Sequence, residues 1–104
     1  MKKIQLYTEA ILDATENRLK KDSSVLLIGL GVPDPKGIFG TTTDLQKKFG
    51  DDRVFDCPIS ENSITGILIG AAINGFKPIL THQRVEFSLL AVDQMFTQAA
   101  KWSY

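Results

Sequence analysis

Segments in which apolar residues recur at helical spacing alternate along this chain with short, continuous apolar runs. The clearest run covers residues 25–28, Val-Leu-Leu-Ile, which polar residues precede and Gly29 follows. A strand that is apolar at every position is typical of a parallel sheet covered by helices on both faces. Because helical segments and such runs alternate throughout, we predict an α/β fold, an open parallel sheet with helices on both faces.

The predicted elements follow one another without an internal repeat or a linker. Amphipathic spacing predicts a helix over residues 6–21, and a short helix capped by a threonine is expected over residues 42–49. Ser60 opens a third helix that ends near Asn74, where Gly75 can adopt the left-handed conformation. The remaining elements are strands over residues 24–30, 53–56 and 77–82, and a last helix over residues 87–101 whose apolar face includes Leu90, Ala91, Met95 and Ala99.

The composition describes one folded globular unit, with 43% hydrophobic and 23% charged residues among 104. Twelve basic and twelve acidic side chains give a formal net charge of +0, so no overall field attracts nucleic acid or anionic lipid. The longest apolar run, around residues 64–73, is too short to span a bilayer. We therefore expect no nucleic acid and no membrane among the partners.

Cysteine and histidine usage bears on the compartment and on metal binding. Cys57 is the single cysteine, so no internal disulfide can form, and a reducing compartment is the simpler interpretation. Glu9 and Asp13 interrupt the apolar stretch near the start before the hydrophobic region of a signal peptide can form. We therefore expect a cytoplasmic protein. With His82 as the single histidine, a structural zinc site is not expected, and no metal ligand is predicted in this chain.

A set of motifs occurs in one register along nearly the whole chain. The central motif is residues 53–61, Arg-Val-Phe-Asp-Cys-Pro-Ile-Ser-Glu, followed by a helix of small residues at 66–72. Gly-Ile-Phe-Gly lies upstream at 37–40, and Gly-Phe-Lys-Pro-Ile lies downstream at 75–79. Together these motifs resemble the N-terminal part of the beta subunits of 2-oxoacid (pyruvate-type) dehydrogenase decarboxylases. More broadly, the chain resembles the transketolase-like pyrimidine-binding domain.

The resemblance implies part of a thiamine diphosphate-dependent enzyme that performs decarboxylation or two-carbon transfer. In that family a glutamate placed like Glu61 hydrogen-bonds N1′ of the cofactor's aminopyrimidine and activates the cofactor. Phe87 falls where the family places a ring that stacks on the aminopyrimidine. Gln83 departs from the family, because it matches a position that is usually apolar there, and it is a further predicted cofactor-binding residue in a more polar pocket. From the residues alone, Ser60 and Glu61 also fit an ordinary helix cap and first-turn acid, and Phe87 also fits core packing.

Two further candidates follow the third predicted strand. His82 is expected at its carboxyl end, the edge where ligands bind in open parallel sheets. An imidazole there can move protons on a bound substrate, so His82 is a second catalytic candidate. Arg84 is a weaker candidate for binding a carboxylate or phosphate of the substrate. The ordinary alternatives are a histidine hydrogen-bonded to backbone and an arginine in solvent.

The segment after the first strand departs from the family pattern. Gly-Leu-Gly-Val at residues 29–32 stands where the dehydrogenase subunits have acidic residues, and neither acid is present. The proton communication that the family associates with those acids is therefore in doubt, and a transketolase-like synthase stays an alternative to a dehydrogenase. The same segment is not a dinucleotide fingerprint, because Pro33 and Pro35 keep the next residues extended. We interpret its glycines as forming a tight turn.

The resembling enzymes hold the diphosphate and its magnesium on a separate domain through a Gly-Asp-Gly motif, which this sequence lacks. We therefore expect a homo- or hetero-oligomer whose active site lies between this chain and a diphosphate-binding domain or alpha-type subunit. Because residues 101–104 follow the last helix without a cap, we expect a truncated N-terminal portion of a pyrimidine-binding domain, inactive by itself. The alternatives are a noncatalytic fragment that acts as an assembly module and a small nucleotide-binding domain that uses the loop after Ile28.

Overall fold

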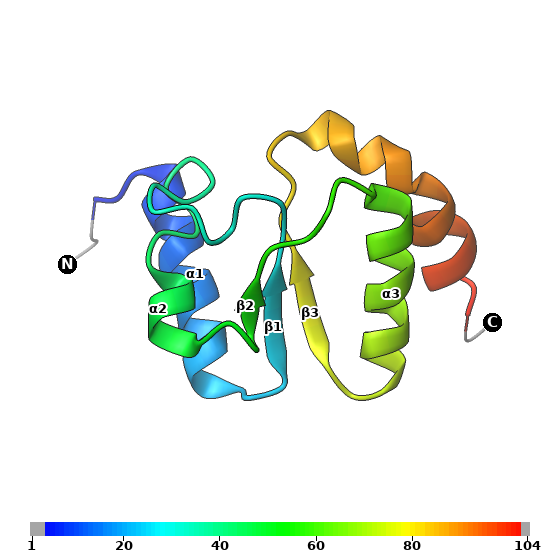
Figure 1. Ribbon diagram of the computed structural model, residues 1–104, viewed down its shortest axis with the longest axis horizontal. Helices are drawn as coiled ribbons and strands as arrows, with labels where there is room; N and C mark the ends of the chain where they lie inside the picture. The colour runs from blue at the N-terminus through cyan, green and yellow to red at the C-terminus, as the bar shows by residue number, and fades with distance from the viewer. Residues whose placement is uncertain (1–3, 103–104) are drawn as a thin grey trace.

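A computed structural model describes residues 4–102, and a small parallel sheet forms its centre (Figure 1). The strands are β1 (Val25–Ile28), β2 (Val54–Phe55) and β3 (Lys77–Leu80), arranged in the order β2-β1-β3. Leu27 of β1 lies opposite Val54 on one side and Ile79 on the other, and both strand pairs are parallel. The predicted parallel sheet is confirmed, although each strand is shorter than its expected range.

Helices cover both faces of this sheet. Helices α1 (Tyr7–Lys21) and α2 (Leu45–Phe49) lie on one side, and α3 (Glu61–Ile73) lies on the other (Figure 1). Because successive strand residues point to opposite faces, Val25 and Leu27 face α1 and α2, whereas the buried Ile28 faces the side of α3. The predicted arrangement with helices on both faces is confirmed.

The main hydrophobic core fills the space between the sheet and the α1 and α2 layer. Burying an aliphatic side chain contributes about 1.5–3 kcal/mol to folding, so this cluster supplies much of the stability. In contrast, the buried residues of α3 are Thr65 and Leu68, and Ile67 and Ile73 of the same helix are exposed. The buried members of the main core are Leu19, Val25, Leu27, Val32, Ile38, Leu45 and Val54.

Arg53 joins the end of α1 to the sheet. Its Nη2 atom donates hydrogen bonds to the backbone oxygens of Leu19 (2.9 Å), Asp22 (2.9 Å) and Val25 (3.1 Å). The guanidinium carbon also lies 5.6 Å from the centroid of the Phe49 ring. The last carbonyl groups of a helix have no partner within the helix, and a guanidinium has several donors to offer them. Arg53 therefore fixes α1 against the strands that it covers.

The second helix begins later than the sequence predicts. It starts at Leu45, after Asp44 with a φ of 61°. Thr42 is not its cap, because the buried Thr42 hydroxyl accepts a hydrogen bond from the N–H of Ile38 at 2.9 Å. The predicted threonine cap over residues 42–49 is therefore wrong, and the side chain instead closes the loop that precedes the helix.

The single α-helix predicted over residues 87–101 is also wrong. The chain forms η1, a 3₁₀-helix over Val85–Ala91, and then η2, a π-helix over Asp93–Ala99, both packed against α3. Turns that are tighter or wider than an α-turn rotate side chains away from the 3.6-residue spacing. Ala91 is buried as predicted. Leu90, which α-helical spacing placed on the same apolar face, is instead 61% exposed.

Helix α3 has the predicted extent within one residue at each end. Ser60 precedes its first residue, but the Ser60 side chain makes no capping hydrogen bond. Gly75 has a φ of 97°, so the expected left-handed glycine after this helix is confirmed.

Two expectations concern the chain as a whole. No helix within residues 4–102 has the length and apolar character needed to cross a bilayer. The expectation of a truncated domain was drawn from residues 101–104, of which Ser103 and Tyr104 lie outside the described part. It stays a prediction.

Candidate functional site

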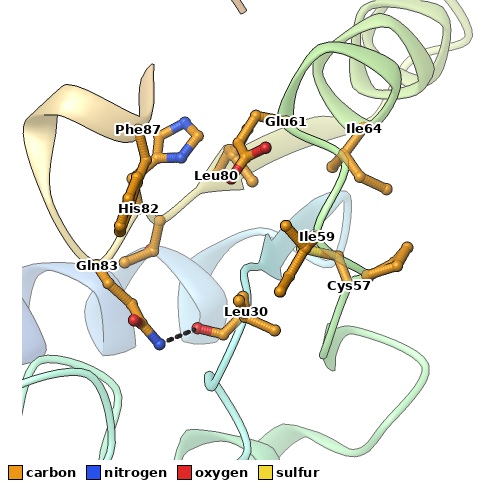
Figure 2. A pocket seen from close by; sticks show the side chains of 11 residues that line it. Leu30, Cys57, Ile59, Glu61, Ile64, Leu80, His82, Gln83 and Phe87 are labelled. Atoms are coloured by element: carbon orange, nitrogen blue, oxygen red, sulfur yellow. Dashed lines mark hydrogen bonds between the residues drawn. The ribbon is translucent and has the colours of Figure 1, made fainter. Parts of the chain in front are cut away.

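A pocket lies at the carboxyl ends of the strands, between the start of α3 and the segment that follows β3 (Figure 2). Parallel strands direct their carboxyl ends to one edge of the sheet, so residues distant in sequence meet there. The residues that line the pocket are Leu30, Cys57, Pro58, Ile59, Glu61, Ile64, Leu80, Thr81, His82, Gln83 and Phe87.

Glu61 supplies a carboxyl group to this pocket. It is the first residue of α3 and is partly buried, with the apolar side chains of Ile59 and Ile64 among the lining residues. The backbone oxygen of Glu61 accepts a hydrogen bond from the Thr65 hydroxyl at 2.7 Å, within the first turn of the helix. Glu61 therefore presents a carboxyl group among apolar lining residues.

His82, Gln83 and Phe87 form the opposite side of the pocket from Ile59 and Ile64 (Figure 2). His82 is partly buried, so its imidazole lies beside the pocket rather than in bulk solvent. Phe87 is 38% exposed, which shows that it is not a core residue. It lies in η1, after the strand rather than near the end of it.

The Gln83 side chain has a hydrogen-bond partner in the loop after β1. Its Nε2 atom donates a hydrogen bond to the backbone oxygen of Leu30 at 3.2 Å. This bond joins the segment after β3 to the loop after β1. The amide nitrogen is thus directed at the protein backbone.

Arg84 does not line the pocket. Its guanidinium is exposed, and Nη1 lies 3.9 Å from Oε1 of Glu86, which is also exposed. Such a surface pair contributes little to stability. The structure therefore brings Glu61, His82, Gln83 and Phe87 together and leaves Arg84 outside.

Cys57 is a pocket residue that sequence reasoning did not select. Burial raises the pKa of its thiol, and the negative charges of Asp56 and Glu61 add to that effect. The thiol is therefore held in its protonated, uncharged form and belongs to the apolar wall. Its position directly after a strand, at the carboxyl edge of the sheet, was the available signal in the sequence.

The loop after β1 passes very close to the loop after β3. A Cβ atom at Gly29 would lie 2.4 Å from the backbone oxygen of Thr81. Gly31 has a φ of 87°, and the N–H of Val32 donates to the oxygen of Gly29 at 3.1 Å. The predicted tight turn is confirmed, and it brings Leu30 to the pocket wall.

The chemical character of the pocket suits a flat, uncharged heterocycle. It combines a carboxyl group, an aromatic ring and aliphatic side chains, and no Lys or Arg is among its lining residues. A carboxyl group can share a proton with a ring nitrogen, and an aromatic side chain can stack on the ring. Within residues 4–102, no group of three or more His, Cys, Asp or Glu residues is placed to hold a metal ion.

Comparison with known proteins gives a consistent result. Residues 4–104 match the family described as "Transketolase, pyrimidine binding domain". The pyruvate dehydrogenase E1 component subunit beta of Mycoplasma genitalium is 45% identical over 97% of this chain and 31% of its own length. That of Bacillus subtilis is 41% identical over 92% of this chain and 30% of its own length.

The 2-oxoisovalerate dehydrogenase subunit beta of Bacillus subtilis is 38% identical over 97% of this chain and 31% of its own length. This chain thus spans about a third of the length of these relatives. The motifs that carried the resemblance therefore reflect shared ancestry along nearly all of the sequence. This chain belongs to the transketolase pyrimidine-binding domain family.

Proposed function

We propose that this chain supplies the aminopyrimidine-binding side of the active site in a thiamine diphosphate-dependent enzyme of the 2-oxoacid dehydrogenase or transketolase type. The observation that supports this most directly is the partly buried carboxyl group of Glu61 in a pocket at the carboxyl edge of the sheet. Family membership and the names of the relatives, beta subunits of pyruvate and 2-oxoisovalerate dehydrogenases, add support for a 2-oxo acid as the substrate.

Glu61 is the activating residue in this proposal. Its carboxyl group shares a proton with a nitrogen of the aminopyrimidine ring, while Phe87 provides the stacking surface. The partly buried Ile64 excludes water from that contact and so strengthens it. When bound, thiamine diphosphate would supply a nucleophilic carbon and a cationic ring as electron sink for this chemistry.

His82 and Gln83 complete the proposed site. We assign His82 the transfer of a proton on the bound substrate, because its imidazole is partly buried beside the pocket. Gln83 is the proposed polar contact to the cofactor, through the amide oxygen that its bond to Leu30 does not use. Arg84 stays a weaker proposal for the substrate carboxylate, because it lies outside the pocket in this structure.

A second polypeptide region is part of the proposal. No Lys or Arg side chain lines the pocket, so we place the diphosphate and its magnesium on a diphosphate-binding domain or alpha-type subunit. The exposed apolar side chains of α3 and the two helices after β3 offer a surface for assembly into a homo- or hetero-oligomer. We further propose that the chain is the N-terminal portion of a pyrimidine-binding domain and works in the cytoplasm. The exposed apolar residues are Ile67, Ile73, Leu89, Leu90 and Phe96.

The same exposed surface favours a second candidate function, a noncatalytic fragment that acts as an assembly module. The two candidates differ in what Glu61 does. In the enzyme its carboxyl group is required for turnover, whereas in the module it is an ordinary acid in the first turn of a helix.

The test uses the full-length protein with its diphosphate-binding partner, thiamine diphosphate, magnesium and pyruvate or a branched 2-oxo acid. We expect Glu61→Gln to lower kcat by about 10²–10⁴-fold, because glutamine cannot exchange a proton with the ring. Glu86→Gln is the matched control, since this exposed glutamate lies outside the pocket and should leave turnover unchanged. Equal turnover for parent and Glu61→Gln contradicts the catalytic role. A parent complex that assembles without turnover favours the assembly module.

A further inference from the structure

One peptide unit beside the pocket is held from both sides by side chains of the neighbouring strands' loops. The oxygen of Leu30 accepts a hydrogen bond from Gln83 Nε2 at 3.2 Å. The N–H of Gly31, in the same peptide unit, donates to Asp56 Oδ1 at 3.0 Å. Asp56 directly follows β2 and Gln83 follows β3, so the loop after the central strand is tied to both neighbours.

We propose that Asp56 and Gln83 are positioning residues that fix this peptide unit and thereby shape the wall of the cofactor pocket. The proposal rests on the function proposed above. Leu30 lines the pocket and lies outside β1, between Gly29 and Gly31. Glycines on both sides permit many backbone conformations, so a side chain between them needs an external constraint to hold one position.

Asp56 also positions a second residue of the wall. The same Oδ1 atom accepts a hydrogen bond from the N–H of Cys57 at 2.9 Å. One carboxylate oxygen therefore sets the placement of Leu30, through Gly31, relative to Cys57, and both Leu30 and Cys57 line the pocket. Hydrogen bonds from backbone N–H groups to a carboxylate are charge-assisted and stronger than neutral ones.

Gly31 is suited to the approach of Gln83. Its φ of 87° strains any other residue, and a Cβ atom there would lie 3.1 Å from Gln83 Nε2. A side chain at this position would thus crowd the amide group that reaches Leu30. The positive φ of Gly31 and its lack of a side chain both permit the two hydrogen bonds that hold this peptide unit.

The test uses the full-length protein and its partner, with two readouts. Amide hydrogen exchange at Gly31, measured without cofactor, reports the bond to Asp56, and titration with thiamine diphosphate and magnesium reports Kd. We expect Asp56→Ala to accelerate the exchange and to raise Kd about tenfold, while the variant stays folded at the temperature of the titration. Asp56→Asn retains an oxygen that can accept both bonds and should stay within about threefold of the parent.

Gln83→Met keeps the length of the side chain without the donor, and should also raise Kd about tenfold. The double variant with Asp56→Ala should raise Kd by less than the product of the two effects, because both act through one peptide unit. Asp51→Ala, an exposed position before β2, is the control and should leave both readouts unchanged.

The outcomes separate this proposal from the function on which it rests. A parent that binds the cofactor normally, with Kd unchanged in Asp56→Ala, overturns the positioning role alone. An unchanged Kd in Gln83→Met also removes the direct cofactor contact proposed for Gln83. Unchanged exchange at Gly31 in Asp56→Ala overturns the positioning role as well. A parent that does not bind thiamine diphosphate at all overturns the proposed function, and the positioning role with it.

Discussion

At the scale of single residues, Gly29 is the glycine at which an added Cβ atom would be most crowded. A Cβ atom there would lie 2.4 Å from the Thr81 oxygen, a backbone atom that cannot rotate away. We expect Gly29→Ala to lower the free energy of unfolding by about 1–3 kcal/mol, as overpacking does. Urea denaturation of the full-length protein measures this. Gly70→Ala is the control, because nothing lies within 4 Å of its Cβ and it should stabilise α3 by about 0.5–1 kcal/mol. Equal losses at the two glycines would show that space is not the cause.

The restriction at Gly29 illustrates what the sequence could and could not predict about the site. Glu61 and Phe87 were predicted from the family resemblance, and His82 from its place at the carboxyl end of the third predicted strand. The contact of Gly29 with Thr81 depends on the register that places Ile28 opposite Leu80. A register between strands distant in sequence is a property of the folded sheet, so no local pattern encodes it. The bonds of Asp56 and Gln83 to the loop after β1 were missed for the same reason.

Asp22 joins the end of α1 to the start of β3 and makes the stability depend on pH. A hydrogen bond from the Lys77 ammonium, then bonds from the Ser24 hydroxyl and N–H, hold the pKa of its carboxyl group well below the ordinary value. A lowered folded-state pKa stabilises the protein above the unfolded pKa, and this contribution is lost as pH falls through the folded value.

We therefore expect the free energy of unfolding to fall as the pH decreases below about 4, the usual pKa of aspartic acid. Asp22→Asn should flatten this decline, because asparagine does not titrate in this range. Urea denaturation at several pH values between about 5 and 2.5 measures the slope. An identical slope in parent and Asp22→Asn would assign the acid sensitivity to other carboxyl groups.

At the scale of elements, the buried face of the segment after β3 differs from the face that the sequence predicts. Leu90 and Ala91 were both placed on the buried face, but only Ala91 is fully buried. We expect Ala91→Gln to lower the free energy of unfolding by about 2 kcal/mol or more, because the amide would be buried or the packing disrupted. Leu90→Gln should change it by less than about 0.5 kcal/mol. Thermal or urea unfolding of both variants measures these losses of stability. A larger loss for Leu90→Gln than for Ala91→Gln would favour a regular α-helix in this segment.

The amino-acid sequence predicts some elements better than others for a physical reason. The run at residues 25–28 predicted β1 well, because a continuous apolar run reports burial on both faces directly. The start of α2 was misplaced, because Thr42 satisfies the N–H of Ile38 rather than a helix end. The segment Val85–Ala91 turns more tightly than an α-helix while it packs on α3, and tertiary contact can override local propensity.

At the scale of the whole molecule, the two helical layers have different characters (Figure 1). The layer of α1 and α2 closes over a buried aliphatic core. The layer of α3, η1 and η2 leaves several large apolar side chains at the surface, among them Ile67 and Phe96. Exposed apolar residues that gather on neighbouring elements mark surfaces for association. The second layer is therefore where a partner region is expected to cover the chain.

This difference predicts the effect of introducing charge on each layer. We expect the double variant Ile67→Lys and Phe96→Lys to weaken association of the full-length protein with its diphosphate-binding partner by at least about tenfold, because burying unpaired ammonium groups is costly. Both side chains are exposed, so the variant should unfold at the temperature of the parent. Sedimentation velocity measures the association. Tyr7→Lys places the same charge on the exposed surface of α1 and should leave assembly unchanged. Loss of assembly by Tyr7→Lys alone would instead place the partner over the α1 and α2 layer.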